Sequence, residues 1–305
     1  MAPEPTSVAV RGTAIFLGFV GMLMFAATLP ATRIALDGLS PAFITSGRAV
    51  VAAGIAGALL VVTRTPIPSK ADVLNLGAIA LCLVCGFPLF TGLALQTVGA
   101  SHGGVVLAIL PIATAGAATL LGSERPSPRF WALGAIGAAV LLLFTLSSAG
   151  WTVQLGDIFL LFAAASAAFG YAVSGTLSQT MKGWRVIAWA LVLALPATVS
   201  FSVVFAPSQW PTAPWVWGGF IYVSVFSMFV GIVFWNGAMA LGGISKIAQI
   251  QLLQPFFTIA IAAVFVGEAL EARQIGFALV LVLIVAAAQR ARVARRSDVL
   301  RGAEP

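Results

Sequence analysis

Charged residues are scarce in this chain of 305 residues: 8% are charged and 60% are hydrophobic. A soluble globular domain has about 25% charged residues, so this sequence carries too few charges to cover two soluble domains. Apolar runs of roughly 20 residues recur along the whole sequence, and each is long enough to cross a hydrocarbon core of about 30 Å. The composition therefore predicts an all-α integral membrane protein that lies in a lipid bilayer.

Groups that carry out catalysis or bind metals are also few. The chain has one histidine and two cysteines, and it has no H-E-x-x-H, aspartate-rich or Ser/His arrangement in an apolar run. Cys82 and Cys85 form a C-x-x-C without further ligands, which indicates packing as small apolar side chains. We predict that the protein is not an enzyme, with no catalytic residue, no metal site and no cofactor.

Apolar runs separated by turn and charge signals predict ten membrane-spanning helices. The expected spans are 13–35, 42–63, 73–95, 101–122, 130–149, 157–179, 186–206, 215–240, 246–267 and 273–291. Seven of the eight tryptophans fall near span ends, where an amphipathic ring prefers to lie. Trp235 is the exception.

The basic residues lie between the spans rather than in one patch, so nucleic acid is not an expected partner despite a pI near 10.5. A cytoplasmic N-terminus leaves only Arg33 and Arg273 outside, with Arg48 inside the second span. Short cytoplasmic loops carry the excess of Lys and Arg, so we expect a multi-pass protein of the bacterial inner membrane with both termini cytoplasmic. The cytoplasmic set is Arg11, Arg64, Lys70, Arg125, Arg129, Lys182, Arg185, Lys246, Arg290, Arg292, Arg295, Arg296 and Arg301.

The sequence repeats itself at an offset of 144 residues. The most informative identities at this offset are Pro111 with Pro255, Glu124 with Glu268 and Arg129 with Arg273. The expected organisation is a leader (1–12), a first five-helix repeat (13–149), a second (150–291) and a basic tail (292–305). Because five is odd, the second repeat enters the membrane in the opposite direction.

Inverted repeats are typical of transporters, because two such copies can open alternately to each side of the membrane. A structural or enzymatic role gives no reason for this symmetry. A channel is compatible with the composition, but the inverted repeat favours a carrier. We therefore expect a transporter that works by alternating access to a small-molecule substrate in a central cavity.

Several motifs resemble the EamA branch of the drug/metabolite transporter superfamily, whose members have ten helices. The resemblance covers residues 13–290 and rests on four segments. They are Ser101…Pro111…Gly122-Ser-Glu124-Arg-Pro126, Ser245…Pro255…Gly267-Glu268, the SGRAVVAAGIAG around Arg48, and GDIFLLFAAASAAFGYA at the start of the sixth span. It implies two five-helix halves and transport of amino acids, other metabolites or drugs. The first span departs from the family, because FAATLPATRIAL lacks a tryptophan often found there.

The ninth span is unusually polar. Gln251, Gln254, Pro255 and Thr258 share one helical face at i, i+3, i+4 and i+7 spacing. Pro255, like Pro111 in the first repeat, removes a backbone hydrogen bond and predicts a helix kink. The glutamines either line a cavity or form interhelical hydrogen bonds. Because only the second repeat carries them, Gln251 and Gln254 are the first candidates for substrate contact.

Arg48 lies about 10 Å from the outer end of its span and can snorkel, pair with carbonyls or attract a carboxylate. The amide of Asn236 lies at membrane depth, where polar groups mark substrate pathways. The aromatic candidates either pack in the core or line the site. The further substrate-binding candidates are Trp235, Asn236, Tyr171, Tyr222, Thr91, Phe87, Phe25 and Arg48.

His102 near the outer face and Lys246 near the inner face occupy symmetric places and are either helix-end residues or gates. No acid lies deep within a span, so we expect facilitated transport or exchange rather than a carboxylate proton relay. This charge pattern fits exporters or facilitators of zwitterions or anions such as amino acids. The alternative is a flippase for lipids or lipid-linked sugars, which needs a polar lateral cleft. Small-residue stretches such as 54–57 also permit a homodimer.

Overall fold

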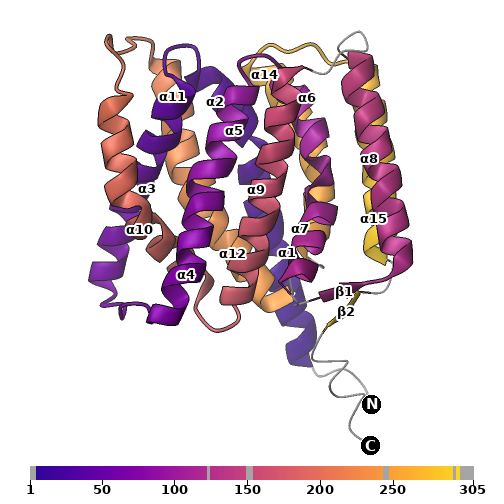
Figure 1. Ribbon diagram of the computed structural model, residues 1–305, viewed down its shortest axis with the longest axis horizontal. Coiled ribbons are helices and arrows are strands. Elements are labelled where there is room, and N and C mark those ends of the chain that lie inside the picture. The colour runs from indigo at the N-terminus through magenta and orange to yellow at the C-terminus, as the bar shows by residue number, and fades with distance from the viewer. Residues whose placement is uncertain (1–4, 122–123, 149–153, 243–246, 291–292, 296–305) are drawn as a thin grey trace, which may run out of the picture.

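The computed structural model describes residues 5–121, 124–148, 154–242, 247–290 and 293–295. They form a bundle of upright helices (Figure 1). The structure confirms an all-α membrane fold. The elements are α1 (Pro5–Ala26), α2 (Thr28–Ala35), α3 (Pro41–Val62), α4 (Lys70–Ile79), η1 (Ala80–Gly86), α5 (Phe87–Ala94), α6 (Ala100–Val106), η2 (Leu107–Ile109), α7 (Leu110–Leu120), β1 (Glu124–Pro126), α8 (Pro128–Ser148), α9 (Leu155–Leu177), α10 (Gly183–Val204), α11 (Pro214–Tyr222), η3 (Val223–Val230), α12 (Gly231–Gly242), η4 (Gln249–Leu253), α14 (Gln254–Phe265), α15 (Ala272–Arg290) and β2 (Val293–Arg295).

Seven helical stretches in the described part of the chain are long and apolar enough to cross a membrane. Three shorter apolar helices, at 128–144, 250–265 and 272–288, fall where the fifth, ninth and tenth spans were predicted. The ten predicted spans therefore each correspond to helix. The two short strands β1 and β2 pair antiparallel at one end of the bundle (Figure 1).

The two repeats share their irregularities as well as their helices. Helices α4 and α11, α5 and α12, α7 and α14, and α8 and α15 begin 144 residues apart. The π-helical segments η1 and η3 occupy equivalent places in the third and eighth spans, and the 3₁₀ segments η2 and η4 precede Pro111 and Pro255. The sequence offset of 144 residues is thus repeated in the backbone.

Contacts between helices follow the symmetry expected of two inverted repeats. Equivalent spans pack together: α3 packs with α10, α8 packs with α15, and α6 of the fourth span packs with α14 of the ninth. The first span packs on α12 of the eighth, and its counterpart α9 packs on α4 and α5 of the third. The pair α8 and α15 forms one side of the molecule, and α3 and α10 lie toward the other (Figure 1). The two halves are therefore interleaved.

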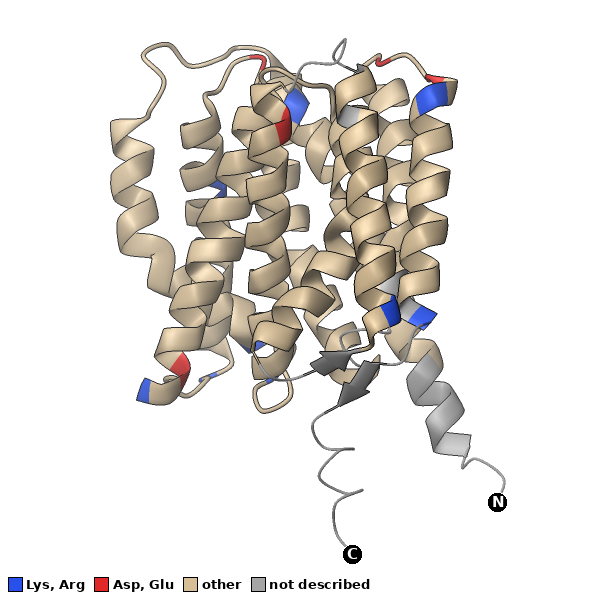
Figure 2. Ribbon diagram, turned by 45° about the vertical axis from the view of Figure 1, so that its right-hand side comes forward, with Lys and Arg blue, Asp and Glu red and all other residues tan. Residues whose placement is uncertain are grey.

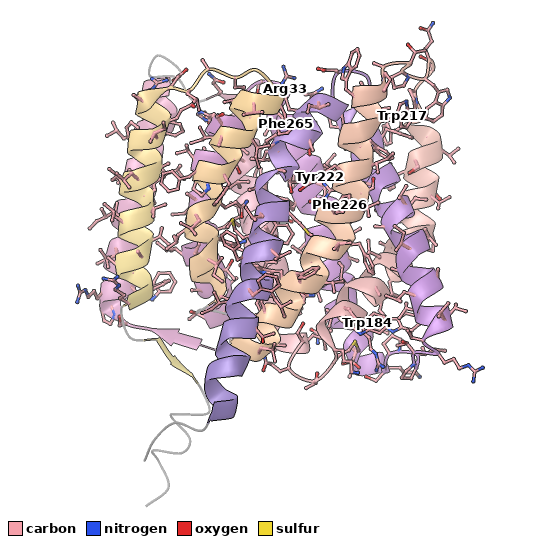
Figure 3. All side chains as sticks on the ribbon, turned by 180° about the vertical axis from the view of Figure 1, so that it is seen from behind. Arg33, Trp184, Trp217, Tyr222, Phe226 and Phe265 are labelled. Carbon is pink, nitrogen blue, oxygen red and sulfur yellow. The ribbon has the colours of Figure 1, made fainter. Side chains whose placement is uncertain are left out.

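Lys, Arg, Asp and Glu gather at the two ends of the helices and leave the middle of the bundle nearly uncharged (Figure 2). The start of α1 and the end of α15 lie at the same end (Figure 1). Trp217 lies near one end and Trp184 near the other, whereas Tyr222 and Phe226 lie at middle height (Figure 3). This distribution is that of a multi-pass membrane protein.

Candidate functional site

The first span is broken in its middle. Its helix stops at Ala26 and restarts at Thr28, two residues before Pro30. Proline has no N–H, so the carbonyl of Ala26 loses its helical donor. The hydroxyl of Thr258, in α14 of the other repeat, donates to that carbonyl at 2.9 Å. Irregular backbone at membrane depth is tolerated where its polar groups have such partners. The break is therefore stabilised by the second repeat.

A second carbonyl beside the break is also bound from the other repeat. Tyr222, at the end of α11, donates from its hydroxyl to the carbonyl of Met24 at 3.0 Å. Thr28 donates to the same carbonyl at 3.4 Å. Tyr222 was predicted to contact substrate, and the structure places it against the helix break.

A chain of hydrogen bonds connects the break to the one charged side chain predicted to be within a span. Nη2 of Arg48 donates to the hydroxyl of Ser227 at 3.0 Å, and the hydroxyls of Ser227 and Thr28 share a hydrogen bond of 2.8 Å. Ser227 belongs to the π-helical segment η3, a kind of distortion that is frequent at functional sites. Arg48, Ser227 and Thr28 are all buried. These hydrogen bonds therefore connect α2, α3 and η3 around the cation of Arg48.

Three of the predicted aromatic residues form one cluster next to this chain. The ring centroids of Phe25 and Tyr171 are 6.1 Å apart, those of Phe25 and Trp235 5.9 Å, and those of Tyr171 and Trp235 6.2 Å. Phe25 directly follows Met24, whose carbonyl accepts a hydrogen bond from Thr28, so this cluster adjoins the hydrogen-bond chain. Four residues predicted from four different spans thus lie together, and we call Arg48, Ser227, Thr28, Tyr171, Phe25 and Trp235 the central cluster.

The polar face of the ninth span is arranged differently. The carbonyls that Pro111 and Pro255 release, those of Leu107 and Gln251, accept 3₁₀ hydrogen bonds from the residues just before each proline. These backbone groups therefore need no polar cavity. Gln251 is 4% exposed and its side-chain Oε1 has no hydrogen-bond partner, as is also true of Oε1 of Gln254.

Asn236 holds three helices together. Its Oδ1 accepts from the hydroxyl of Ser174 at 3.0 Å, and its Nδ2 donates to the carbonyl of Gly183 at 3.1 Å. A Cβ on Gly183 would lie 2.7 Å from Cβ of Asn236, so the start of α10 packs closely on this residue. Asn236 is fully buried, and its amide is already bonded on both sides.

Thr91 and Phe87 lie on α5, and Thr91 bonds within its own helix. Its hydroxyl donates to the carbonyls of Phe87 and Pro88 at 2.8 and 3.0 Å. Phe87 is half-buried and packs against the main core. The structure places neither residue in a described contact with the central cluster.

The N-terminal end of α6 makes two connections to the second repeat. Nε2 of His102 lies 2.7 Å from Oδ1 of Asp157 in the first turn of α9, and the His102 ring stacks on Phe144. The Glu268 carboxylate accepts hydrogen bonds from the backbone N–H groups of Ala100 and Ser101 at 2.6 and 2.8 Å. A carboxylate is favourable at a helix N-terminus. Lys246, the proposed inner gate, lies outside the described residues.

Two hollows are lined by described residues, and both are on the outside of the bundle. One, of about 380 Å³, is lined by Leu59, Thr63, Trp184, Phe229, Val230 and Val233. The other, of about 410 Å³, is lined by Val140, Leu143, Arg273, Gly276, Phe277 and Val280. No predicted substrate-binding residue lines either hollow. The residues of the central cluster are all buried in this conformation.

Sequence reasoning missed Ser227, Thr28 and Asp157. Serine and threonine are common in membrane helices, so their presence in an apolar run carries little information. A usable signal was Pro30 within the first span, because a proline there predicts a broken helix and a freed carbonyl.

Comparisons with known proteins agree with this arrangement. The EamA-like transporter family matches twice, over residues 12–146 and 154–288. The chain is 41% identical over 275 residues to a protein of Bacillus subtilis (strain 168) named "Uncharacterized transporter YdeK", covering 90% of this chain and 96% of that protein. A solved structure described only as "Crystal structure of protein" superposes with a TM-score of 0.66 at 19% identity, covering 90% of this chain and 97% of the other.

The structural likeness shows a shared fold. The two family matches divide the chain as its repeated irregularities do, into two copies of one helical unit. The chain therefore belongs to the EamA-like transporter family, as the resemblance of its motifs implied.

Proposed function

We propose that this protein moves small metabolites such as amino acids across the bacterial inner membrane by alternating access, as an exporter or facilitator. The observation that carries the proposal is the central cluster, where a broken helix, a π-helical segment and a buried cation meet. Substrate sites of transporters built from inverted repeats lie near the bilayer midplane, where helices are discontinuous.

The repeats supply the means of movement. Helices of one repeat contact their counterparts of the other, so a shift of one half against the other changes both ends of the bundle. At the outer end Glu268 and the His102–Asp157 pair join the two repeats. These contacts have to separate before substrate can reach the central cluster from that side.

The proposed orientation follows the charges. The α3–α4 and α9–α10 connections and the start of α8 lie at the end where α1 begins and α15 ends (Figure 1). These segments carry Arg64, Lys70, Lys182, Arg185 and Arg129. Positive loops remain cytoplasmic, so both termini are placed in the cytoplasm.

Counterflow tests the transport proposal. Purified protein in liposomes preloaded with one unlabelled amino acid is expected to accumulate the labelled compound, with a rate that saturates with its concentration. A panel of amino acids and other small metabolites tests which compounds are moved. Conductance that rises without saturation would indicate a channel, and movement of labelled lipid without any counterflow would indicate the flippase instead.

A further inference from the structure

We propose that Arg48 and the buried donors around it form an anion subsite that selects substrates carrying a carboxylate. This inference rests on the transport function proposed above and adds the chemical class of the substrate. It also assigns the cation a partner that the described side chains do not provide.

The first argument is charge. Arg48 is 2% exposed, and an arginine keeps its proton at physiological pH. Among the described side chains, ion pairs join His102 with Asp157 and Arg273 with Glu271, and neither involves Arg48. A buried charge without a counter-ion is strongly unfavourable, so the site is incomplete until an anion enters.

The second argument is hydrogen-bonding capacity. An arginine has five N–H donors, and the bond that Arg48 makes to Ser227 uses one of them. Nε of Arg48 and Nε1 of Trp235 are both buried without a hydrogen-bond partner. A carboxylate only accepts hydrogen bonds and matches the planar fork of a guanidinium. The central cluster thus has two buried donors, Nε of Arg48 and Nε1 of Trp235, with no acceptor among the described residues.

The hydroxyl groups beside Arg48 are also consistent with an anion subsite. Because Arg48 donates to Ser227, the Ser227 proton is free to go to Thr28, whose own proton goes to the Met24 carbonyl. The chain therefore fixes the guanidinium without neutralising it. Arg48 is held in place by neutral groups and keeps its charge available for a ligand.

The neighbouring aromatic residues supply the contact for the rest of such a substrate. Tyr171 lies in the same cluster as Phe25 and Trp235, next to the hydrogen bonds that hold Arg48. A small molecule with a carboxylate at one end and an apolar body meets both requirements. Inorganic phosphate is also an anion, but it has no apolar group that could contact the aromatic side chains.

The experiment measures thermal unfolding of the purified protein with acetate, L-alanine, L-leucine, the corresponding amides, and inorganic phosphate. Carboxylates are expected to raise the melting temperature of the wild type, and amides are not. Arg48→Met is expected to lose this response while its unliganded melting temperature stays equal or rises, because an apolar side chain replaces an uncompensated charge. Arg33→Met is the matched control, since Arg33 is half-buried near the outer end, and it should respond like the wild type.

Counterflow of L-leucine and L-leucinamide provides the second readout. The wild type is expected to prefer the acid by about tenfold or more, and Arg48→Met by less than about twofold. Arg48→Lys keeps the charge without the fork and is expected to show a weakened thermal response to carboxylates. Should Arg48→Met not fold, an unchanged response in Arg48→Lys overturns the proposal.

Other outcomes separate this proposal from the transport function. Equal counterflow of acid and amide in the wild type leaves transport standing and overturns the anion subsite. An Arg48-dependent thermal response without any counterflow supports the subsite and contradicts transport. A response to phosphate but not to carboxylates overturns the assigned substrate class. A lower unliganded melting temperature in Arg48→Met, with acid and amide affected alike, assigns Arg48 a structural role and also overturns it.

Discussion

The hydroxyl of Thr258 donates to the carbonyl of Ala26 at 2.9 Å, across 232 residues of sequence. The acceptor is free because Pro30 cannot donate to it. A side chain from the ninth span thereby satisfies the backbone carbonyl that the break in the first span leaves without a helical donor.

Thr258→Val is expected to destabilise the protein by about 1–2 kcal/mol, because the buried carbonyl of Ala26 loses the hydroxyl that donates to it. The control is Thr114→Val, at the equivalent position of the first repeat, whose hydroxyl is buried without a partner. That variant should unfold at the wild-type temperature or above it. Thermal unfolding in detergent measures both, and equal losses in the two variants would contradict this account.

Asn236→Ala is expected to reduce stability by about 1–3 kcal/mol, because Ser174 and Gly183 lose a shared buried partner. The KM for counterflow of the protein that remains folded should not change, since the amide is occupied within the protein. Thr91→Val serves as the control because its hydroxyl bonds only within its own helix. A raised KM at unchanged stability would instead place Asn236 against substrate.

Glu268→Ala is expected to loosen the end of the bundle where α6 begins, because the first N–H groups of α6 lose a charged acceptor. A cysteine introduced at the buried Val98, with Cys82 and Cys85 replaced by alanine, should react faster with a membrane-impermeant maleimide. Glu271→Ala is the control, since that carboxylate pairs with Arg273 on an exposed surface. Labelling that is the same in both variants would show that Glu268 does not hold this end closed.

Counterflow is expected to be insensitive to an imposed pH gradient. Of the described acidic residues, Asp157 is the one that lies buried in a span, and it pairs with His102 at the start of α9 rather than at the central cluster. The measurement compares counterflow rates with and without a gradient of about one pH unit, a tenfold difference in proton activity across the membrane. A rate that follows the gradient in the wild type, and no longer does in His102→Asn, would assign proton coupling to this pair.

The ten spans and the inverted repeat could be predicted because both depend on the order of residues along the sequence, without knowledge of which helices pack together. Hydropathy located the helices, and the recurrence of Pro111 at Pro255 set the offset. The grouping of Arg48, Tyr171 and Trp235 could not be predicted, since it depends on which helices pack together. Each of these residues was a candidate for its own chemistry, without an expected neighbour.

Two other features lay beyond sequence reasoning for local reasons. The 3₁₀ bonds that satisfy the carbonyls of Leu107 and Gln251 depend on small changes of backbone dihedral angles, which residue type does not dictate. The partner of Glu268 depends on where the end of the ninth span meets the start of α6. In both cases the sequence identified a polar group that requires a hydrogen-bond partner, but it did not identify the partner.

The π-helical segments η1 and η3 occur at the same place in both repeats. A π-helical turn holds more residues than an α-helical turn, so each repeat carries the same local surplus of chain. Two independent gains at one position are a poorer account than a single inheritance. A single five-helix ancestor that already had this distortion accounts for both copies, whereas Gln251 and Ser227 differ from Leu107 and Leu83 at the equivalent positions of the first repeat.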